Sequence, residues 1–397
     1  MSDTAFRPDP PTEFENVRQK MRILSVFGTR PEAIKMAPLV SAMAAEPTLT
    51  SLVCVTGQHR AMLDQVLGLF RISPDYDLDV MEPDQTLNAL CARVMSKLDA
   101  VLEEARPDRV LVHGDTTTAL AAALAAFNRG IKVGHVEAGL RTYDLTRPWP
   151  EEMNRQVVDR LCDQLFAPTP TAAANLASEH VQGNVTITGN TGIDALFLTL
   201  ARIDSDAVLR QGLEARFANI GTARRLVLVT GHRRENFGAG FIAICDALAR
   251  LDGRGDVDIV YPVHLNPNVR DPVMERLGDC PNIHLIAPLD YVPFLYLMRR
   301  ATLVLTDSGG VQEEAPSLGK PVLVMRDVTE RPEAVIAGTV ELVGTDATRI
   351  VSAVARLLDD PAHYAQFAQR LNPYGDGKAA GRIVDTLCGR PTSTFAA

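Results

Sequence analysis

Three carboxylates and one histidine stand where they could transfer protons. Asp115, Glu137 and His232 each follow an apolar run, so each is expected just beyond the carboxyl end of a strand. In open α/β sheets, ligands bind at that end of the strands. Glu151 opens a predicted helix after a proline-rich loop that carries the only tryptophan, Trp149. Together the four groups suggest acid–base chemistry.

Two of these residues, Asp115 and Glu151, also have a simpler explanation. Asp115 could cap the helix expected from about residue 117, and taken alone this is the favoured interpretation. Glu151 could simply complement the dipole of the helix that it opens. Glu137 has only apolar or glycine neighbours in the sequence, so we expect its pKa to be raised. His232 is followed by two arginines and a glutamate, which is not typical of a core histidine.

A second group of residues could hold a nucleotide diphosphate. An apolar run ends at Ser308, Gly309 and Gly310, and a helix-like segment follows. Adjacent glycines let backbone N–H groups approach a ligand, and the start of a helix favours an anion. Glu314, one turn further on, could accept hydrogen bonds from ribose hydroxyls. An ordinary strand-to-helix loop explains the two glycines equally well.

Positive charge is available for such a ligand. Arg30 and Lys35 flank the start of the first predicted helix, and Arg233 and Arg331 lie in the second half of the chain. A phosphate or pyrophosphate is a natural partner for these groups, although Arg30 and Lys35 could also be solvated helix charges. The first strand is not followed by G-x-G-x-x-G, so a dinucleotide site of the dehydrogenase type is not supported.

Alternating strands and helices position these residues. Strands are expected at 22–27, 52–56, 109–113, 132–136, 163–167, 185–188, 226–230, 258–262, 283–286, 303–306 and 322–325. This alternation predicts parallel sheets that are covered on both faces. We expect two α/β halves that meet between residues 192 and 226. The acids come from the first half and the glycine turn from the second, which suggests a cleft between them.

Composition excludes several classes of protein. A net charge of −9 and a pI near 5.5 argue against a nucleic-acid surface. The six cysteines form no C-x-x-C pair, and five stand in apolar or helical contexts, which favours buried thiols in a reducing cytosol. No apolar run approaches a membrane span, and the histidine spacing matches no zinc pattern. Residues 1–20, polar and rich in proline, are expected to be a disordered leader.

Several segments closely resemble the non-hydrolysing UDP-N-acetylglucosamine 2-epimerases, over roughly residues 21–390. They are FGTRPEAIKMAPL (27–39), TGQHR (56–60), HGDTTT (113–118), GHVEAGLRT (134–142), PEEMNR (150–155), GNTGIDAL (189–196), TGHRRENFG (230–238) and TDSGGVQEEAPSLGKPVLVMRDVTERPEA (306–334). The resemblance implies a GT-B-like α/β fold, with two Rossmann-like domains and the active site between them. It also implies cofactor-free interconversion of UDP-GlcNAc and UDP-ManNAc by a cytoplasmic homodimer that its own substrate often activates.

The expected division of the chain follows from this resemblance. Residues 21–190 would form the N-terminal domain with the acid–base residues, and residues 191–372 the C-terminal domain that binds UDP. Residues 373–397 would form a helix that packs back on the N-terminal domain, followed by a tail.

Carried over by position, the family's catalytic set matches Asp115, Glu137, Glu151 and His232. Its nucleotide-sugar contacts match Arg30, Lys35, Asp115, Glu137, His232, Phe294, Ser308, Gly309, Gly310, Glu314 and Arg331. Two positions depart from the family. Leu289 replaces a glutamine that is common near the uracil, which leaves recognition of the base to backbone atoms and to stacking on Phe294. Asp84 replaces a residue that is basic in some members and contacts the effector.

The mechanism that the resemblance implies is anti-elimination of UDP to give 2-acetamidoglucal, followed by re-addition with the opposite configuration at C-2. Asp115 and Glu137 are favoured for proton transfer, while Glu151 could transfer a proton or orient the sugar. Because we expect a raised pKa at Glu137, release of the glucal is expected from Glu137→Gln. The product would supply ManNAc units for cell-surface polysaccharide. The alternatives are a GT-B glycosyltransferase with a UDP-sugar donor, a hydrolysing epimerase, a nucleotide-sugar sensor, and an epimerase of a related diacetamido sugar.

Overall fold

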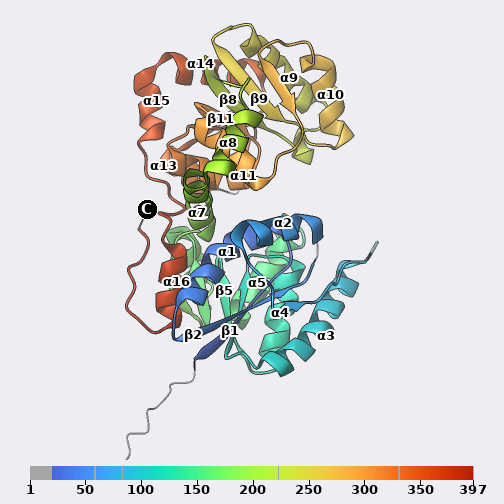
Figure 1. Cartoon of the computed structure of the whole chain (residues 1–397), viewed down its shortest axis with the longest axis vertical. Coiled ribbons are helices and arrows are strands. Elements are labelled where there is room, and N and C mark those ends of the chain that lie inside the picture. Colours follow the sequence, from blue (N-terminus) through green and yellow to red (C-terminus); the bar gives the residue numbers. More distant parts are fainter. Residues whose placement is uncertain (1–19, 58–59, 83, 222, 330, 397) are drawn as a thin grey trace, which may run out of the picture.

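Two parallel sheets organise this computed structural model, which describes residues 20–57, 60–82, 84–221, 223–329 and 331–396 (Figure 1). All but the last residue of the expected leader, 1–20, lies outside the described residues. The first sheet has the order β3-β2-β1-β4-β5-β6-β7 and the second the order β10-β9-β8-β11-β12-β13. Every strand pair is parallel. Two α/β modules result, one above the other in the figure.

The strands of the first sheet are β1 (Met21–Phe27), β2 (Leu49–Val55), β3 (Tyr76–Asp77), β4 (Arg109–His113), β5 (Lys132–Val136), β6 (Gln164–Ala167) and β7 (Asn184–Ile187). Those of the second are β8 (Arg225–Thr230), β9 (Val257–Pro262), β10 (Ile283–Ile286), β11 (Leu303–Thr306), β12 (Val322–Val324) and β13 (Val340–Leu342). Every strand expected from the sequence is confirmed, with ends that differ by up to three residues. The edge strands β3 and β13 were not expected, because two or three residues show no periodicity.

Helices cover both faces of the first sheet. They are α1 (Arg30–Ala45), α2 (Arg60–Phe70), α3 (Leu87–Ala105), α4 (Thr117–Asn128), α5 (Glu151–Leu161), α6 (Pro170–Ser178) and, from the far end of the chain, α16 (Ala379–Leu387). One core cluster joins the sheet to α3 and α4, and another joins its opposite face to α1, α2 and α16. The central strand β4 is buried at all five positions, as expected for the middle of a parallel sheet; its apolar centre, Val110–Val112, lies between two buried polar residues, Arg109 and His113.

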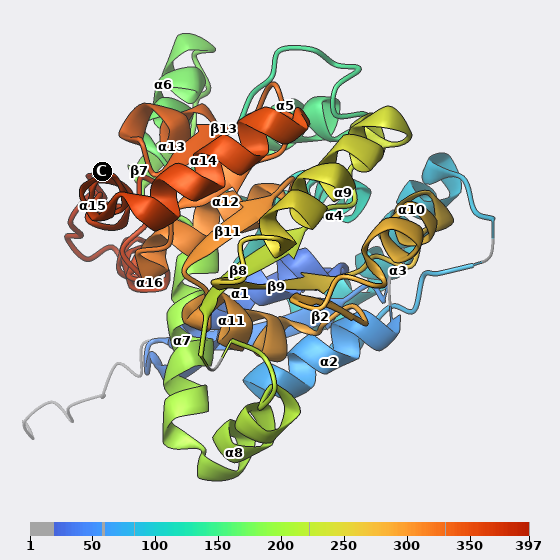
Figure 2. The same ribbon diagram turned by 90° about the horizontal axis from the view of Figure 1, so that it is seen from above.

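The second sheet is built in the same way. Its helices are α8 (Ala207–Arg216), α9 (Ala239–Asp252), α10 (Pro267–Leu277), α11 (Tyr291–Arg300), α12 (Gly309–Glu314), α13 (Pro332–Ala337), α14 (Ala347–Asp359) and α15 (Pro361–Ala368), with 3-10 turns at Arg234–Asn236 and Ala315–Leu318. Figure 2 shows α9 beside both α10 and α14, in agreement with their packing contacts. The core on that face is separate from the core beneath α11.

One helix, α7 (Thr191–Ser205), packs against both modules. Its Ala195 belongs to the core of the first sheet, whereas Leu196 and Leu200 belong to the core of the second. The chain returns across the same junction, and α16 then packs on α1 and α7 (Figure 1). The two modules are therefore joined by packed helices, and the loops at their facing ends are held close together.

The structure also bears on the expected burial of the cysteines and on the membrane-span expectation. All six cysteines are free thiols, but only Cys54, Cys162 and Cys245 are buried. The expectation of five buried thiols was thus wrong for some of them, because the others lie on helix or loop surfaces that are only partly covered. Among the described residues, no helix combines the length and the apolar character that crossing a membrane requires.

Candidate active site

The three predicted acids line one cavity of about 280 Å³ at the ends of β4 and β5 and the start of α5. Asp115, Glu137 and Glu151 face it from the first module, and Arg331 faces it from the second. The sequence separates these residues widely, yet the parallel sheet brings the strand ends to one edge. Arg155 also lines the cavity, so positive charge lies beside the acids.

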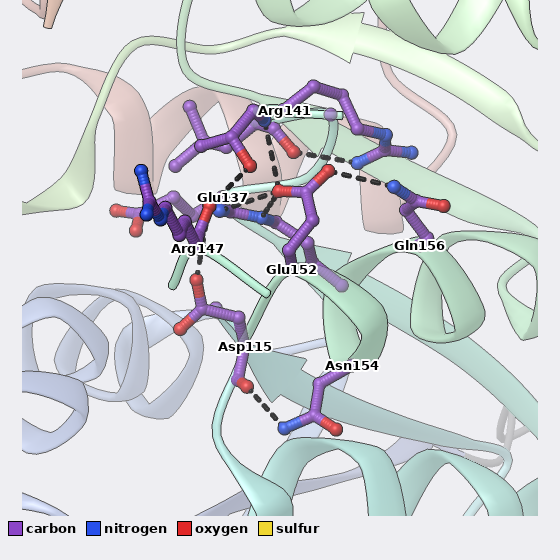
Figure 3. Close-up of polar contacts among 12 residues, drawn as sticks. Asp115, Glu137, Arg141, Arg147, Glu152, Asn154 and Gln156 are labelled. Atoms are coloured by element: carbon purple, nitrogen blue, oxygen red, sulfur yellow. Dashed lines mark hydrogen bonds and ion pairs between the residues drawn. The ribbon is translucent and has the colours of Figure 1, made fainter. Parts of the chain in front are cut away.

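Asp115 does not cap the helix that follows it. Thr116 is the N-cap of α4, and its side chain accepts the Ala119 N–H at 3.1 Å. Asn154 instead donates to the backbone carbonyl of Asp115 at 2.8 Å (Figure 3), and Arg155 Nη1 lies 3.3 Å from the Asp115 carboxylate. The capping interpretation is therefore wrong. The side chain of Asp115 faces the cavity instead.

The surroundings of Asp115 favour its protonated form. Burial raises the pKa of Asp115, the charge of Arg155 opposes this shift, and the charges of Glu137 and Glu151 add to it. Asp115 therefore holds a proton more readily than an ordinary aspartate does.

Glu137 has the opposite electrostatic environment. Its carboxylate pairs with the Lys35 ammonium, accepts a hydrogen bond from Asn190 Nδ2 at 3.2 Å, and lies 3.6 Å from His113 Nε2. Burial by itself raises the pKa of Glu137, but Lys35 and His113 outweigh it and hold that pKa well below its usual range. The expectation of a raised pKa was wrong, because the flanking residues in the sequence are not the groups that surround the carboxylate.

Glu137 also adopts an unusual backbone conformation, with φ of 71°. Left-handed conformations are uncommon for residues other than glycine, and they occur often at functional sites. The turn directs the side chain of Glu137 from the end of β5 into the cavity.

The two glutamates at the start of α5 have different roles, one in lining the cavity and one in holding a loop. Glu151 lines the cavity, whereas Glu152 is fully buried and accepts the backbone N–H groups of Thr142 and Tyr143, each at 3.0 Å. Glu152 also pairs with Arg155 at 2.7 Å and accepts from Gln156 (Figure 3). Glu152 thus anchors the loop that covers the acids, a role that the helix-dipole interpretation did not suggest.

A second cavity, of about 220 Å³, opens on the other side of the junction. Its lining includes the predicted residues Arg30, His232, Phe294 and Ser308, together with Leu289. Arg30 comes from the first module and the others come from the second. The lining of this cavity thus combines apolar side chains, among them Phe294 and Leu289, with the polar side chains of His232 and Arg30.

His232 is held at the cavity by a buried aspartate that the sequence analysis missed. Asp307 has no exposed surface and accepts the backbone N–H groups of His232 and Arg233, each at 2.8 Å. The imidazole itself is 43% exposed, as expected for a histidine outside the core. Burial lowers the pKa of His232, Asp307 opposes the shift, and Arg233 and His264 add to it. The neutral imidazole is therefore favoured.

The turn at Ser308 and Gly309 separates the two cavities. Ser308 lines the second cavity, while a Cβ atom on Gly309 would lie 3.6 Å from the guanidinium of Arg331, which lines the first, and 3.8 Å from that of Arg233. Gly310 has open space where a Cβ would stand. Two guanidinium groups therefore meet a glycine turn between the cavities, an arrangement that suits a phosphate group.

Glu314 lies behind this turn. It accepts the hydroxyl of Tyr291 at 3.0 Å, and Tyr291 lines the second cavity. Burial raises the pKa of Glu314 to about 7; the hydrogen bond from Tyr291 opposes the shift and the charge of Glu313 adds to it. Glu314, a predicted substrate contact, is therefore linked to the second cavity through the side chain of Tyr291.

Two residues missed by the sequence analysis join the modules at the site. Glu313 pairs with Arg331 and lies 3.5 Å from Lys35, and Asn190 donates to the carboxylates of both Glu137 (3.2 Å) and Glu313 (3.1 Å). Both stand in the motif segments, but no local pattern reveals the partners of Asn190, which lie 53 and 123 positions away.

A third missed residue could have been found from its spacing. Glu32 accepts the N–H groups of Gly28 (3.0 Å) and Thr29 (2.7 Å) and the Thr116 hydroxyl (2.6 Å). The spacing Thr29-x-x-Glu32 is a capping box, which is visible in the sequence. The box fixes the loop after β1 against the loop that carries Asp115.

The described residues gather no three His, Cys, Asp or Glu side chains in a geometry that could hold a metal ion.

Two Rossmann-like modules with a site between them define a GT-B-like protein. A solved sucrose-phosphate synthase from Thermosynechococcus elongatus has this fold at a TM-score of 0.61, with 14% identity over 93% of this chain and 100% of that chain. The chain belongs to the UDP-N-acetylglucosamine 2-epimerase family, whose model matches residues 41–388.

Close relatives support this assignment. The UDP-N-acetylglucosamine 2-epimerase of Yersinia pestis is 58% identical over 92% of this chain and 98% of its own length. A crystal structure of the Neisseria meningitidis enzyme, bound to UDP-GlcNAc, superposes with a TM-score of 0.86 at 50% identity, over 93% of this chain and 100% of that chain.

Proposed function

We propose that this protein is an isomerase that interconverts UDP-GlcNAc and UDP-ManNAc by inverting C-2 of the sugar. Membership of the family supports this activity, as does the likeness to a Neisseria enzyme whose structure holds UDP-GlcNAc. The product would provide ManNAc units for surface polysaccharide.

The observation that carries the proposal is the placement of the glycine turn between two unlike cavities. The diphosphate would lie at Gly309 between Arg331 and Arg233, the uridine would reach toward Phe294, and the sugar would enter the acid cavity. A nucleotide sugar consists of the same three groups in the same order: a nucleoside, a diphosphate and a sugar. Leu289 in the apolar cavity supports recognition of the base by packing and backbone atoms.

The electrostatic environments of Glu137 and Asp115 suggest which of them removes a proton and which donates one. We assign Glu137 as the base that removes the C-2 proton, because Lys35 and His113 keep it ionised. As that proton leaves, its electron pair forms the C-1–C-2 double bond of 2-acetamidoglucal, the C-1–O bond breaks, and UDP departs with its negative charge. Arg30, His232 and Arg331 would stabilise the departing UDP.

Asp115 is the matching acid. Its raised pKa suits it to deliver a proton to C-2 from the opposite face while UDP re-adds at C-1. The reverse reaction exchanges the two roles. Glu151, at the same cavity, is assigned to orient the sugar.

One NMR experiment tests the function. The enzyme is incubated with UDP-GlcNAc alone in D2O, and the expected product is UDP-ManNAc with deuterium at C-2. Free ManNAc with UDP would indicate a hydrolysing enzyme, and no change without an acceptor would favour a glycosyltransferase. UDP-ManNAc that keeps protium at C-2 would contradict the proton-transfer mechanism.

The assignment of domains and of assembly belongs to the same proposal. We take residues 21–190 as the acid–base domain, 191–372 as the UDP-binding domain and 373–397 as a return segment, which is supported by the two sheets and by the packing of α16 on α1. The free cysteines agree with a reducing cytoplasm. The expected homodimer would give a light-scattering mass twice the 43.1 kDa of the chain.

A further inference from the structure

A fully buried histidine–aspartate pair lies behind the acid cavity. His135 is in β5, just before Glu137, and Asp159 is in α5, the helix that Glu151 opens. Neither side chain has exposed surface, and His135 Nδ1 lies 2.6 Å from Asp159 Oδ1. A hydrogen bond of that length requires a proton between the two atoms. Neither residue lines the cavity, so neither has a role in the proposed chemistry itself.

The second ring nitrogen of His135 binds the backbone next to Asp115. His135 Nε2 lies 2.8 Å from the carbonyl oxygen of Gly114, and because a carbonyl only accepts, Nε2 is the donor. Gly114 directly precedes Asp115 and has φ of 63°, so the orientation of this peptide sets the direction in which the chain enters Asp115.

The other oxygen of Asp159 binds the loop after Glu137. Asp159 Oδ2 accepts the N–H of Gly139 at 3.2 Å and pairs with Arg141 Nη1 at 2.8 Å. Arg141 is itself buried and donates through Nε to Glu179 at 2.6 Å. The loop that leaves Glu137 is thereby tied to α5, and α5 also holds Asp115 through Asn154.

We propose that His135 and Asp159 are positioning residues that fix the Asp115 and Glu137 loops relative to each other; this inference rests on the proposed function. Removing a proton from one face of C-2 and returning one from the other demands two carboxylates at a set separation. A misplacement of about 1 Å can cost roughly 100-fold in rate. A buried polar pair stabilises a fold less well than apolar residues of similar size do, so the pair is better explained by the specific geometry that it imposes.

The test compares His135→Leu, His135→Gln and Asp159→Asn in the full-length protein. Leu fills the space without either hydrogen bond, whereas the amide nitrogen of Gln can replace Nε2 and still donate to Gly114. We expect His135→Leu to lower kcat about 100-fold and His135→Gln about tenfold, with KM for UDP-GlcNAc changed by less than about threefold. Release of 2-acetamidoglucal per turnover should rise in both.

The second module supplies a matched control in Asp258→Asn. Asp258 is also buried, accepts a glycine N–H (Gly221, 3.0 Å) and pairs with an arginine (Arg224, 3.2 Å), but it lies in β9 and lines neither cavity. We expect both Asp→Asn changes to lower the melting temperature and only Asp159→Asn to lower kcat. Equal kcat values in the two variants, or no rescue by Gln relative to Leu, would overturn the positioning role.

The outcomes also separate this inference from the function on which it rests. A wild-type enzyme that makes no UDP-ManNAc would contradict the proposed function. A wild-type enzyme that makes it, beside His135 and Asp159 variants of normal kcat, would contradict only the positioning role. If His135→Leu does not fold, the comparison of Asp159→Asn with Asp258→Asn still decides.

Discussion

At the scale of single residues, two carboxylates that line one cavity have opposite tendencies to hold a proton. Glu137 is surrounded by a lysine, a histidine and an amide that favour its charged form. For Asp115, burial and the charges of Glu137 and Glu151 favour the protonated form, and Arg155 and His113 oppose it. One acid that is ionised and one that keeps its proton are what a two-face proton transfer needs at the start of a turnover.

Amide variants test this division of roles. We expect Asp115→Asn and Glu137→Gln to lower turnover by roughly 100- to 10,000-fold while folding and UDP binding survive, because each variant keeps the shape of the side chain and loses its charge and its ability to transfer a proton. Starting from UDP-GlcNAc, Asp115→Asn should still eliminate UDP and release 2-acetamidoglucal, since Glu137 remains as the base. The environment of Glu137 thus shifts the expected release of glucal from Glu137→Gln to Asp115→Asn.

The control for this series is Glu103→Gln, an exposed change on α3 that should leave turnover unchanged. Product and glucal are followed together by NMR. Glucal released by Glu137→Gln and not by Asp115→Asn would reverse the assignment. Near-normal epimerisation by both variants would remove the carboxylates from the mechanism.

Glu314 gives a pH-dependent prediction. Its folded-state pKa of about 7 lies above the ordinary value for glutamate, so between these values the folded state binds more protons than the unfolded state. The free energy of unfolding should therefore fall as pH rises from about 4.5 to 7 and then level off. Glu314→Gln removes this titration and can still accept the Tyr291 hydrogen bond.

Denaturant unfolding of both proteins between pH 5 and 8 checks the sign. The stability of Glu314→Gln relative to wild type should increase with pH across this range, because only the wild type then carries a buried charge. A difference that stays constant with pH would mean that Glu314 does not titrate in this window.

The sequence predicted that the candidate acids lie together, but it did not predict the ionisation of Glu137. Asp115 and Glu137 could be expected to lie together because they follow strands, and strand ends in a parallel sheet share one edge. Glu151 joins them from the start of α5. The pKa of Glu137 could not be predicted, because Lys35 and Asn190 reach it from distant parts of the chain. Local neighbours in sequence are a poor guide to the neighbours in space that set a charge.

At the scale of elements, the loops that carry Asp115 and Glu137 each contain a glycine with a similar backbone conformation but different surroundings. Gly114 and Gly139 both have positive φ, of 63° and 85°. A Cβ on Gly114 would meet nothing within 4 Å, whereas one on Gly139 would lie 2.3 Å from the carbonyl oxygen of Ala172 in α6. The loop after β5 therefore packs directly against α6 and has no room for a side chain.

We expect Gly114→Ala to cost about 1–2 kcal/mol, the usual penalty for a left-handed alanine. Gly139→Ala should cost more, because the same penalty is joined by displacement of the loop from α6. Chemical denaturation of both variants measures the difference. Equal losses would mean that the Gly139 loop can move away from α6 without cost.

Element prediction succeeded for every strand inside the two sheets and failed for two of the edge strands. The central strand β4 is buried at every position and could be recognised from its apolar centre, Val110–Val112, whereas β3 and β13 add two or three residues at sheet edges. Such strands exist because a neighbouring strand offers them hydrogen bonds. No property of their own sequence requires them.

At the scale of the whole molecule, the two modules meet at a charged junction. Asn190 is the N-cap of α7, the helix that packs against both modules, and its Oδ1 accepts the Gly192 N–H at 2.8 Å. Its side chain carries no charge. Its Nδ2 donates to Glu137 in the first module and to Glu313 in the second. Lys35 lies between the same two carboxylates. The junction could not be predicted from the sequence, because it requires both modules to be in place.

Asn190→Asp tests whether this junction controls the base. The new carboxylate can still cap α7 through one oxygen, but its other oxygen would face Glu137 and Glu313 where Nδ2 donated. Added negative charge raises the pKa of Glu137, so the acid limb of kcat/KM should move to higher pH by about one unit. Asn190→Ala, which loses the cap without adding charge, should lose about 1 kcal/mol of stability and shift the limb less. Asn128→Asp, at the exposed carboxyl end of α4 and so about 17 Å along the helix from the Asp115 loop, adds the same charge away from the acids and should shift nothing. A folded Asn190→Asp enzyme with the wild-type acid limb would show that the charges of the junction do not reach Glu137.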